Sequence, residues 1–282
     1  MKQLKNISIQ GAYGKPILVD ALYKDDNIPK SIVVFCHGYK GFKDWGAWNI
    51  MAQEFALNNF CFIKFNFSHN GGTVEQPIDF PDLEAFGQNN YTKELGDLGS
   101  VLNWIETEFE SNPNFNTSKI ALMGHSRGGA IVTIKAAEDS RIKSVISLAG
   151  VSDFKKRFVT GEALKKWREE GVIYVVNGRT KQNMPHYYQF YEDFIQNEER
   201  LSIKRAAASL QIPYLIVHGD KDNSVALEEA YNLHGWNPDS VLKIIEGADH
   251  VFNTKHPWNK DGVSKELMEV VKVCVHFFLV AK

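Results

Sequence analysis

The residues best suited to chemistry lie at 124–129, which read GHSRGG and place Ser126 between two glycines. A largely apolar run at 119–123 precedes them, and helix-spaced apolar residues follow from Ala130. A strand, then Gly-x-Ser-x-Gly, then a helix start is the arrangement of a nucleophile elbow, in which a sharp turn exposes the serine hydroxyl. Glycine is needed there because larger residues would clash where strand and helix meet. We therefore predict that Ser126 is a nucleophile.

A serine hydroxyl needs a histidine base, and the histidine needs a carboxylate that fixes its tautomer. Behind a nucleophile elbow the chain order is serine, acid, histidine. Residues 218–225 read HGDKDNSV after one apolar run, and residues 246–250 read EGADH after the next. This order predicts Asp222 as the orienting acid and His250 as the base. Asp220 is a competitor better suited to bonding its own turn, and Asp153 is a fallback that could instead cap a helix.

Acyl transfer also needs donors for the oxyanion that forms in the reaction. The backbone amide after the nucleophile, that of Arg127, is the first candidate. The second donor is expected in the loop after the first central strand, where residues 37–39 read HGY. Gly38 lets the backbone turn, so we predict that the Tyr39 amide points into the site. His37 and His125 are interpreted as residues that brace these turns.

The elements that must position these residues alternate along the chain. Continuous apolar runs separated by helix-spaced segments predict an α/β fold with a mostly parallel sheet covered on both faces. All the candidates follow predicted strands, so they would meet at the carboxyl edge of the sheet. Segments 7–10 and 15–23 form the opening hairpin. The other predicted strands are 31–36, 60–67, 119–123, 144–149, 214–217 and 241–245, and the predicted helices are 44–58, 92–109, 130–139, 224–233 and 264–280.

Residues 151–210 interrupt this alternation and are too long for a simple connection. We expect 1–150 and 211–282 to form the hydrolase core and 151–210 to form an inserted lid. The interval contains a helical pattern at 162–170, a possible strand at 172–176 and a helical pattern at 187–197. Its many aromatic residues would suit an aromatic or medium-length acyl group, although packing alone would also explain them.

Composition narrows the class of protein. The chain has 282 residues and a net charge of −2, which gives no basic field for nucleic acid. The three cysteines lie in apolar runs without motif spacing, as buried thiols of a reducing compartment do. Neither a signal peptide nor a membrane span is expected, so we predict a cytoplasmic protein without a membrane partner. No metal or cofactor is called for, and the oligomeric state, including a homodimer, stays open.

Together the motifs at 124–129, 37–39, 218–222 and 247–250 resemble those of the α/β-hydrolase fold, and the resemblance covers nearly the whole chain. Within that fold the chain is similar to the dienelactone-hydrolase-like and feruloyl (cinnamoyl) esterase-like group. It differs from a dienelactone hydrolase in having Ser126 where that enzyme has a cysteine nucleophile. It differs from feruloyl esterases in having Arg127 where they usually have an uncharged residue. The resemblance implies a serine carboxylic-ester hydrolase that acts through an acyl-enzyme on a small or aromatic acyl ester. Two alternatives remain: a serine peptidase of the same fold, of acyl-aminoacyl or dipeptidyl type, and a catalytically silent small-molecule-binding module.

Overall fold

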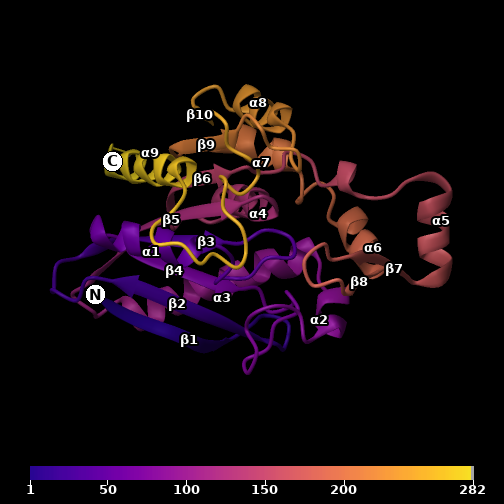
Figure 1. The fold of residues 1–282 in the computed structure, drawn as a ribbon, viewed down its shortest axis with the longest axis horizontal. Coiled ribbons are helices and arrows are strands. Elements are labelled where there is room, and N and C mark those ends of the chain that lie inside the picture. Colours follow the sequence, from indigo (N-terminus) through magenta and orange to yellow (C-terminus); the bar gives the residue numbers. More distant parts are fainter. Residues whose placement is uncertain (281–282) are drawn as a thin grey trace.

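The computed structural model describes residues 1–280 and is built around one eight-stranded sheet (Figure 1). The strand order is β1-β2-β4-β3-β5-β6-β9-β10. The pairs β1–β2 and β2–β4 are antiparallel and the other pairs are parallel, as the long apolar runs predicted. The strands are β1 (Lys2–Gln10), β2 (Pro16–Tyr23), β3 (Lys30–Cys36), β4 (Cys61–Asn66), β5 (Phe115–His125), β6 (Ile142–Leu148), β9 (Tyr214–Gly219) and β10 (Val241–Ile245).

Helices cover both faces of this sheet and divide the core in two. The apolar residues of α1 (Trp48–Leu57) and α9 (Lys265–Val280) pack on one face. Those of α3 (Tyr91–Phe109), α4 (Arg127–Glu138), α7 (Ile203–Ser209) and α8 (Leu227–Trp236) pack on the other. None of the helices in the described part of the chain is long and apolar enough to cross a membrane.

The structure departs from the sequence-based elements at several short segments. Helix α1 begins at Trp48 and not at residue 44, because Gly46 has φ 58°, outside the α-helical region. Three short elements were not predicted: α2 (Leu83–Gly87), β8 (Asn183–Tyr187) and α7. Helices α2 and α7 are each shorter than two turns, and β8 (NMPHY) contains a proline and no continuous apolar run, so neither pattern is visible in the sequence.

Residues 151–210, here called the insert, leave the sheet after β6 and return at β9. These two strands pair directly, so the chain departs and re-enters at neighbouring points. Strand β7 (Val172–Val176) pairs only with β8, outside the central sheet. Together with α5 (Gly161–Glu170) and α6 (Gln189–Gln196) this hairpin lies to the right of the sheet in Figure 1. Helix α7 instead packs against α4 and α8, so the end of the insert joins the helical layer of the core.

Candidate active site

Ser126 sits in a strained turn between β5 and α4. Its backbone has φ 56° and ψ −120°, a conformation that non-glycine residues seldom adopt. The flanking glycines permit it: a Cβ on Gly124 would lie 2.1 Å from the Gly128 oxygen, and one on Gly128 would lie 2.3 Å from the Cys36 oxygen. The Ser126 amide donates to the Leu148 oxygen at 2.9 Å, which ties the turn to β6. The turn therefore has the geometry of a nucleophile elbow.

Asp222 and His250 meet at the ends of β9 and β10. The distance from His250 Nδ1 to Asp222 Oδ2 is 2.7 Å, and the carboxylate side chain is fully buried. Its other oxygen accepts the amides of Ser224 and Val225, each at 2.8 Å. Burial alone would raise the pKa of Asp222, but hydrogen bonds from His218 and His250 bring it well below its ordinary value. An ionised, fully bonded carboxylate thus orients the His250 ring.

Two further histidines support this pair: His125, which was expected to brace the elbow, and His218, for which the sequence predicted no role. His218 Nε2 donates to the Val225 oxygen at 2.9 Å and lies 3.3 Å from Asp222 Oδ2. His125 Nε2 bonds the His250 oxygen at 2.7 Å. Burial lowers the pKa of His125 to about 3, and the neighbouring His250 adds to that effect, so the His125 ring is neutral and donates through Nε2. A polar residue at the buried end of each strand was the available signal.

The two remaining aspartate candidates are bound to backbone amides away from His250. Asp220 Oδ1 accepts the Gly247 amide at 2.7 Å and so joins the turns after β9 and β10. Asp153 Oδ1 accepts the Lys155 amide at 2.7 Å and caps the short 3₁₀ helix Lys155–Arg157. Among the three aspartates considered, Asp222 alone bonds the His250 ring.

The loop after β3 passes directly over Ser126. A Cβ on Gly38 would lie 2.9 Å from Ser126 Cβ, so only glycine allows this approach. The next residue is Tyr39, whose amide donates no hydrogen bond within residues 1–280. Arg127 is the first residue of α4, where amides have no acceptor inside the helix. Both predicted oxyanion donors are therefore free to face a ligand beside Ser126.

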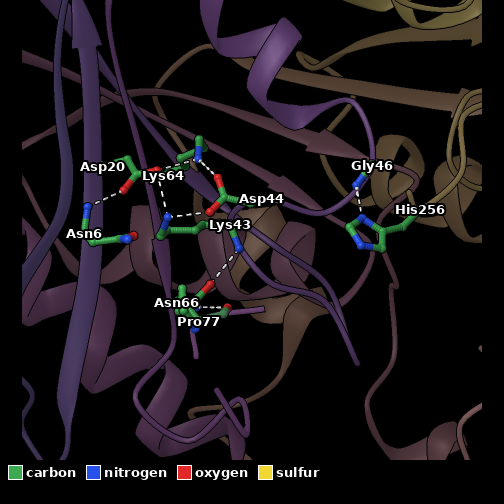
Figure 2. Close-up of polar contacts among 9 residues, drawn as sticks. All are labelled: Asn6, Asp20, Lys43, Asp44, Gly46, Lys64, Asn66, Pro77 and His256. Atoms are coloured by element: carbon green, nitrogen blue, oxygen red, sulfur yellow. Dashed lines mark hydrogen bonds and ion pairs between the residues drawn. The ribbon is translucent and has the colours of Figure 1, made fainter. Parts of the chain in front are cut away.

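A buried ion-pair network anchors this loop to the sheet (Figure 2). Lys43 Nζ lies 2.8 Å from Asp20 Oδ2 and 2.6 Å from Asp44 Oδ2, and Lys64 contacts the same two carboxylates. Burial works to raise the pKa of Asp44, but the two lysines bring it to about 2. The Asp44 carboxylate thus stays ionised, and the four paired groups fix the stretch of loop that follows Tyr39.

Neutral contacts hold the same loop at two more points, also drawn in Figure 2. The Lys43 amide donates to Asn66 Oδ1 at 2.7 Å, and the Asn66 amide group donates to the Pro77 oxygen at 2.8 Å. Further along, the Gly46 amide donates to His256 Nδ1 at 2.9 Å. His256 therefore braces the loop from the chain segment that follows His250.

Ser126 and His250 both line two adjoining cavities, and within residues 1–280 no hydrogen bond joins the Ser126 hydroxyl to His250. Such contacts are often long in unliganded sites and tighten with substrate. The aromatic cavity, of about 540 Å³, is roofed by the insert; its lining includes Tyr39, Tyr91, Phe154, Phe158, Trp167, His186 and Phe190. The polar cavity, of about 580 Å³, is lined by residues around His250, including His125, Asp249, Val251, Lys221 and Lys255.

No metal centre accompanies the site: the described residues hold no group of three or more His, Cys, Asp or Glu side chains that could bind an ion. The cysteines at 36, 61 and 274 are free and buried, and burial raises the pKa of each thiol. They are therefore inert core residues.

Solved structures with the same architecture define the class of protein. The structure of Est1E from Butyrivibrio proteoclasticus with bound ferulic acid superimposes with a TM-score of 0.72 at 16% identity, covering 98% of both chains. A putative dienelactone hydrolase from Klebsiella pneumoniae gives a TM-score of 0.62 at 14% identity, over 99% of this chain and 98% of the other. The chain has the α/β-hydrolase fold, as the motifs predicted.

Within that fold the chain belongs to the prolyl oligopeptidase family, peptidase S9, whose model matches residues 84–256. This range spans the elbow, the insert, the acid turn and the histidine turn. The uncharacterized peptidase YtmA of Bacillus subtilis (strain 168) is 28% identical over 125 residues, or 44% of this chain. That match covers 43% of the relative's length.

Proposed function

We propose that this protein is a serine carboxylic-ester hydrolase in which Ser126, His250 and Asp222 form the catalytic triad. The observation that carries the proposal is the position of Ser126. It occupies a strained elbow at the junction of two cavities, beside a histidine whose other ring nitrogen bonds a buried carboxylate at 2.7 Å. A serine held in this way differs from an ordinary surface serine in exposure, backbone strain and access to a base.

The reaction follows from the groups in place. Ser126 Oγ attacks the ester carbonyl while His250 Nε2 takes its proton, and the amides of Tyr39 and Arg127 bind the oxyanion. The C–O bond to the alcohol then breaks, and His250 returns the proton to the departing oxygen. Water attacks the acyl-enzyme by the same path, which releases the acid and restores the serine. No redox step or cofactor enters this sequence.

The two cavities divide the substrate between them. His250 borders both cavities, and we assign the leaving alcohol to the polar cavity, which His250 lines together with its chain neighbours Asp249 and Val251. The acyl group then lies in the aromatic cavity beside the first turn of α4. Aromatic walls and a volume of about 540 Å³ suit an aromatic or medium-length acyl group.

The insert roofs the aromatic cavity, and we assign it the role of a lid. Trp167, Ile173 and His186 reach the cavity from α5, β7 and β8. Replacing residues 161–187 by a Gly/Ser linker should lower the preference for p-nitrophenyl hexanoate over the acetate, because the acetyl group needs no lid contact. An unchanged preference in a folded variant would show that the insert does not act as a lid.

The family match favours peptide hydrolysis as a second candidate function. An aminopeptidase or dipeptidyl peptidase must hold a cationic amino terminus beside the scissile bond, which calls for a carboxylate there. Among the described residues that line the aromatic cavity none is Asp or Glu, whereas Lys40, Arg127 and Arg157 are cations. The lack of a carboxylate in this cavity disfavours the dipeptidyl type. An acyl-aminoacyl substrate has a blocked, uncharged amino terminus, so the acyl-aminoacyl type is left to the assays below.

Parallel assays separate the two activities. We expect hydrolysis of p-nitrophenyl butyrate and benzoate and little release of p-nitroaniline from aminoacyl-p-nitroanilides, whether their amino group is free or N-acetylated. The Ser126→Ala variant, measured beside the wild type, controls for background hydrolysis. Faster cleavage of the anilides would assign the protein to the peptidases, and an inert wild type that binds esters would make it a binding module.

A further inference from the structure

Arg127 places a guanidinium in the cavity assigned to the acyl group. Its carbon Cζ lies 4.5 Å from the centre of the Tyr39 ring, 5.2 Å from that of Tyr91 and 5.5 Å from that of Phe190. Cation–π contacts of this kind hold a guanidinium in place while its N–H edges remain available. The rings thus fix the orientation of Arg127 and leave its hydrogen-bonding capacity open.

Most of that capacity is unused by the protein. A guanidinium has five N–H donors, and within residues 1–280 Arg127 makes one hydrogen bond, from Nη1 to Glu94 Oε1 at 3.2 Å. The side chain is 15% exposed, and it lines the aromatic cavity. The remaining donors are therefore available to a ligand in that cavity.

The charges around this cavity do not balance. Arg127 is paired with Glu94, and Arg157 with Glu229. Lys40 also lines the cavity, but it has no carboxylate partner in the described part of the chain: its ammonium donates to the Val176 oxygen at 3.3 Å and lies over the Tyr39 ring. One positive charge is left over in a chain whose net charge is −2.

We propose that the acyl group of the substrate carries a carboxylate, which the Arg127 guanidinium binds with Lys40 as the second cation. This inference rests on the proposed ester hydrolysis. A single carboxylate balances the one unpaired charge, and its two oxygens match the fork of guanidinium N–H donors. The substrate class is then the monoester of an aromatic or medium-length dicarboxylic acid, cleaved at the ester and held at the free acid.

The test compares two esters of equal chain length, mono-p-nitrophenyl adipate and p-nitrophenyl hexanoate, which differ in a terminal carboxylate against a methyl group. We expect wild-type kcat/KM to be higher for the adipate by roughly tenfold or more, a size typical of a charge-assisted hydrogen bond. The preference should persist in 0.5 M NaCl, because a contact inside the cavity is screened far less than the surface field.

Arg127→Met should reduce this ratio on the order of 10- to 100-fold, mainly through the KM of the adipate. Arg127→Lys, which keeps the charge and the backbone amide, should reduce it less, since an ammonium cannot form the fork. Arg179→Met is the matched control: Arg179 lines only the polar cavity, so the ratio should not change. Thermal unfolding shows whether each variant folds, and Arg127→Lys carries the test if Arg127→Met does not.

Three results would overturn the inference. A wild type that hydrolyses the hexanoate at least as well as the adipate would leave the esterase standing without the carboxylate site. An adipate preference that survives in folded Arg127→Met, or that falls equally in Arg179→Met, would move recognition away from Arg127. Failure to hydrolyse either ester would mean that the proposed function itself is wrong.

Discussion

Two regions of this molecule bring together a serine, a histidine and an aspartate, and only one of them has the arrangement that a catalytic triad requires. The first is Ser126, His250 and Asp222. The second follows β4, where Ser68 Oγ contacts His69 Nδ1 at 2.7 Å and the two Asp97 oxygens at 2.8 and 3.0 Å. By residue type and distance alone the second cluster is the tighter of the two.

The clusters differ in what the serine is bonded to. Ser68 Oγ and the Ser68 amide both donate to the Asp97 carboxylate, so the hydroxyl is held by an acceptor and not presented to a base. Ser68 does not have a positive φ, and its partners His69 and Asp97 are only 5% and 1% exposed. A cavity of about 260 Å³ borders Ser68, but neither His69 nor Asp97 lines it.

In the first cluster the order of contacts is reversed. The carboxylate bonds Nδ1 of His250 and not the serine, so His250 Nε2 is not used by that carboxylate, and Ser126 lies in a strained turn at the border of two cavities. The comparison teaches that two features decide whether a serine, a histidine and an aspartate can form a catalytic triad: which atom bonds which, and the backbone conformation of the serine. The presence of the three residue types is not enough.

Removing the serines should give the largest contrast. Ser126→Ala should lower kcat on p-nitrophenyl acetate by roughly 10⁴- to 10⁶-fold without unfolding the protein, as losing a triad member does. Ser68→Ala should keep kcat within about twofold, because its hydroxyl has no part in the chemistry. Steady-state kinetics on both variants checks this; more than a tenth of wild-type activity in Ser126→Ala would mean another nucleophile.

The next largest effect is expected for the aspartate that bonds His250. Asp222→Asn should lose roughly 10⁴-fold in kcat, since an amide favours the wrong tautomer of His250. Asp220→Asn should lose far less, because its carboxylate serves a backbone turn. The ranking of these two variants in the same assay is the measurement. A reversal would assign the acid to Asp220, and two nearly normal enzymes would direct attention to Asp153.

The second cluster, Ser68, His69 and Asp97, should affect how the stability of the protein depends on pH. Burial raises the pKa of Asp97 from 3.8 to about 7, with Glu94 adding to the rise and Ser68 and Lys93 opposing it. Between pH 4 and 7 the folded state therefore keeps a proton that the unfolded chain has lost, so the free energy of unfolding falls as pH rises. The fall is on the order of 4 kcal/mol for a shift of about 3 units.

Urea unfolding at pH 4.5, 5.5, 6.5 and 7.5 measures this slope. Asp97→Asn, which keeps an acceptor for Ser68 but cannot ionise, should flatten it, while Asp222→Asn should not. An equal slope in wild type and Asp97→Asn would show that another group carries the proton.

The smallest effect is expected for Ser68→Ala on stability. The substitution removes the hydrogen bonds from a buried carboxylate and should cost about 1–3 kcal/mol of unfolding free energy at pH 7.5. Because the Asp97 carboxyl group is protonated and neutral at low pH, the loss of unfolding free energy should be smaller at pH 4.5. A variant as stable as the wild type at both values would contradict the assigned bonding.

Much of the fold was predictable because buried parallel strands have continuous apolar runs in the sequence. The segment 241–245 matches β10, and 31–36 lies within β3, which begins one residue earlier. Order along the chain then placed Asp222 and His250 after neighbouring strands, where the structure joins them. The elements and the places of these two residues could be predicted because they depend on local pattern and on the direction of the strands.

Contacts between segments that are far apart in the chain could not be predicted from the sequence. The bond of 2.7 Å between the Tyr39 hydroxyl and His186 Nε2 links the loop after β3 to the insert, 147 residues apart. Glu94 reaches Arg127 from α3, although its position reads as an ordinary helix residue. Charges enclosed by packing, such as Glu94 and Asp97, cannot be recognised from periodicity, since the pattern does not say what will cover them.

The most direct test of the account is covalent labelling of the whole protein with a fluorophosphonate, followed by intact mass and peptide mapping. Such probes bond to a serine that is activated by a base beside an oxyanion site. We predict one label per chain, on Ser126, that is lost in Ser126→Ala and retained in Ser68→Ala. A protein that takes no label, or that takes it on any other serine, would contradict the central claim that the elbow serine is the nucleophile.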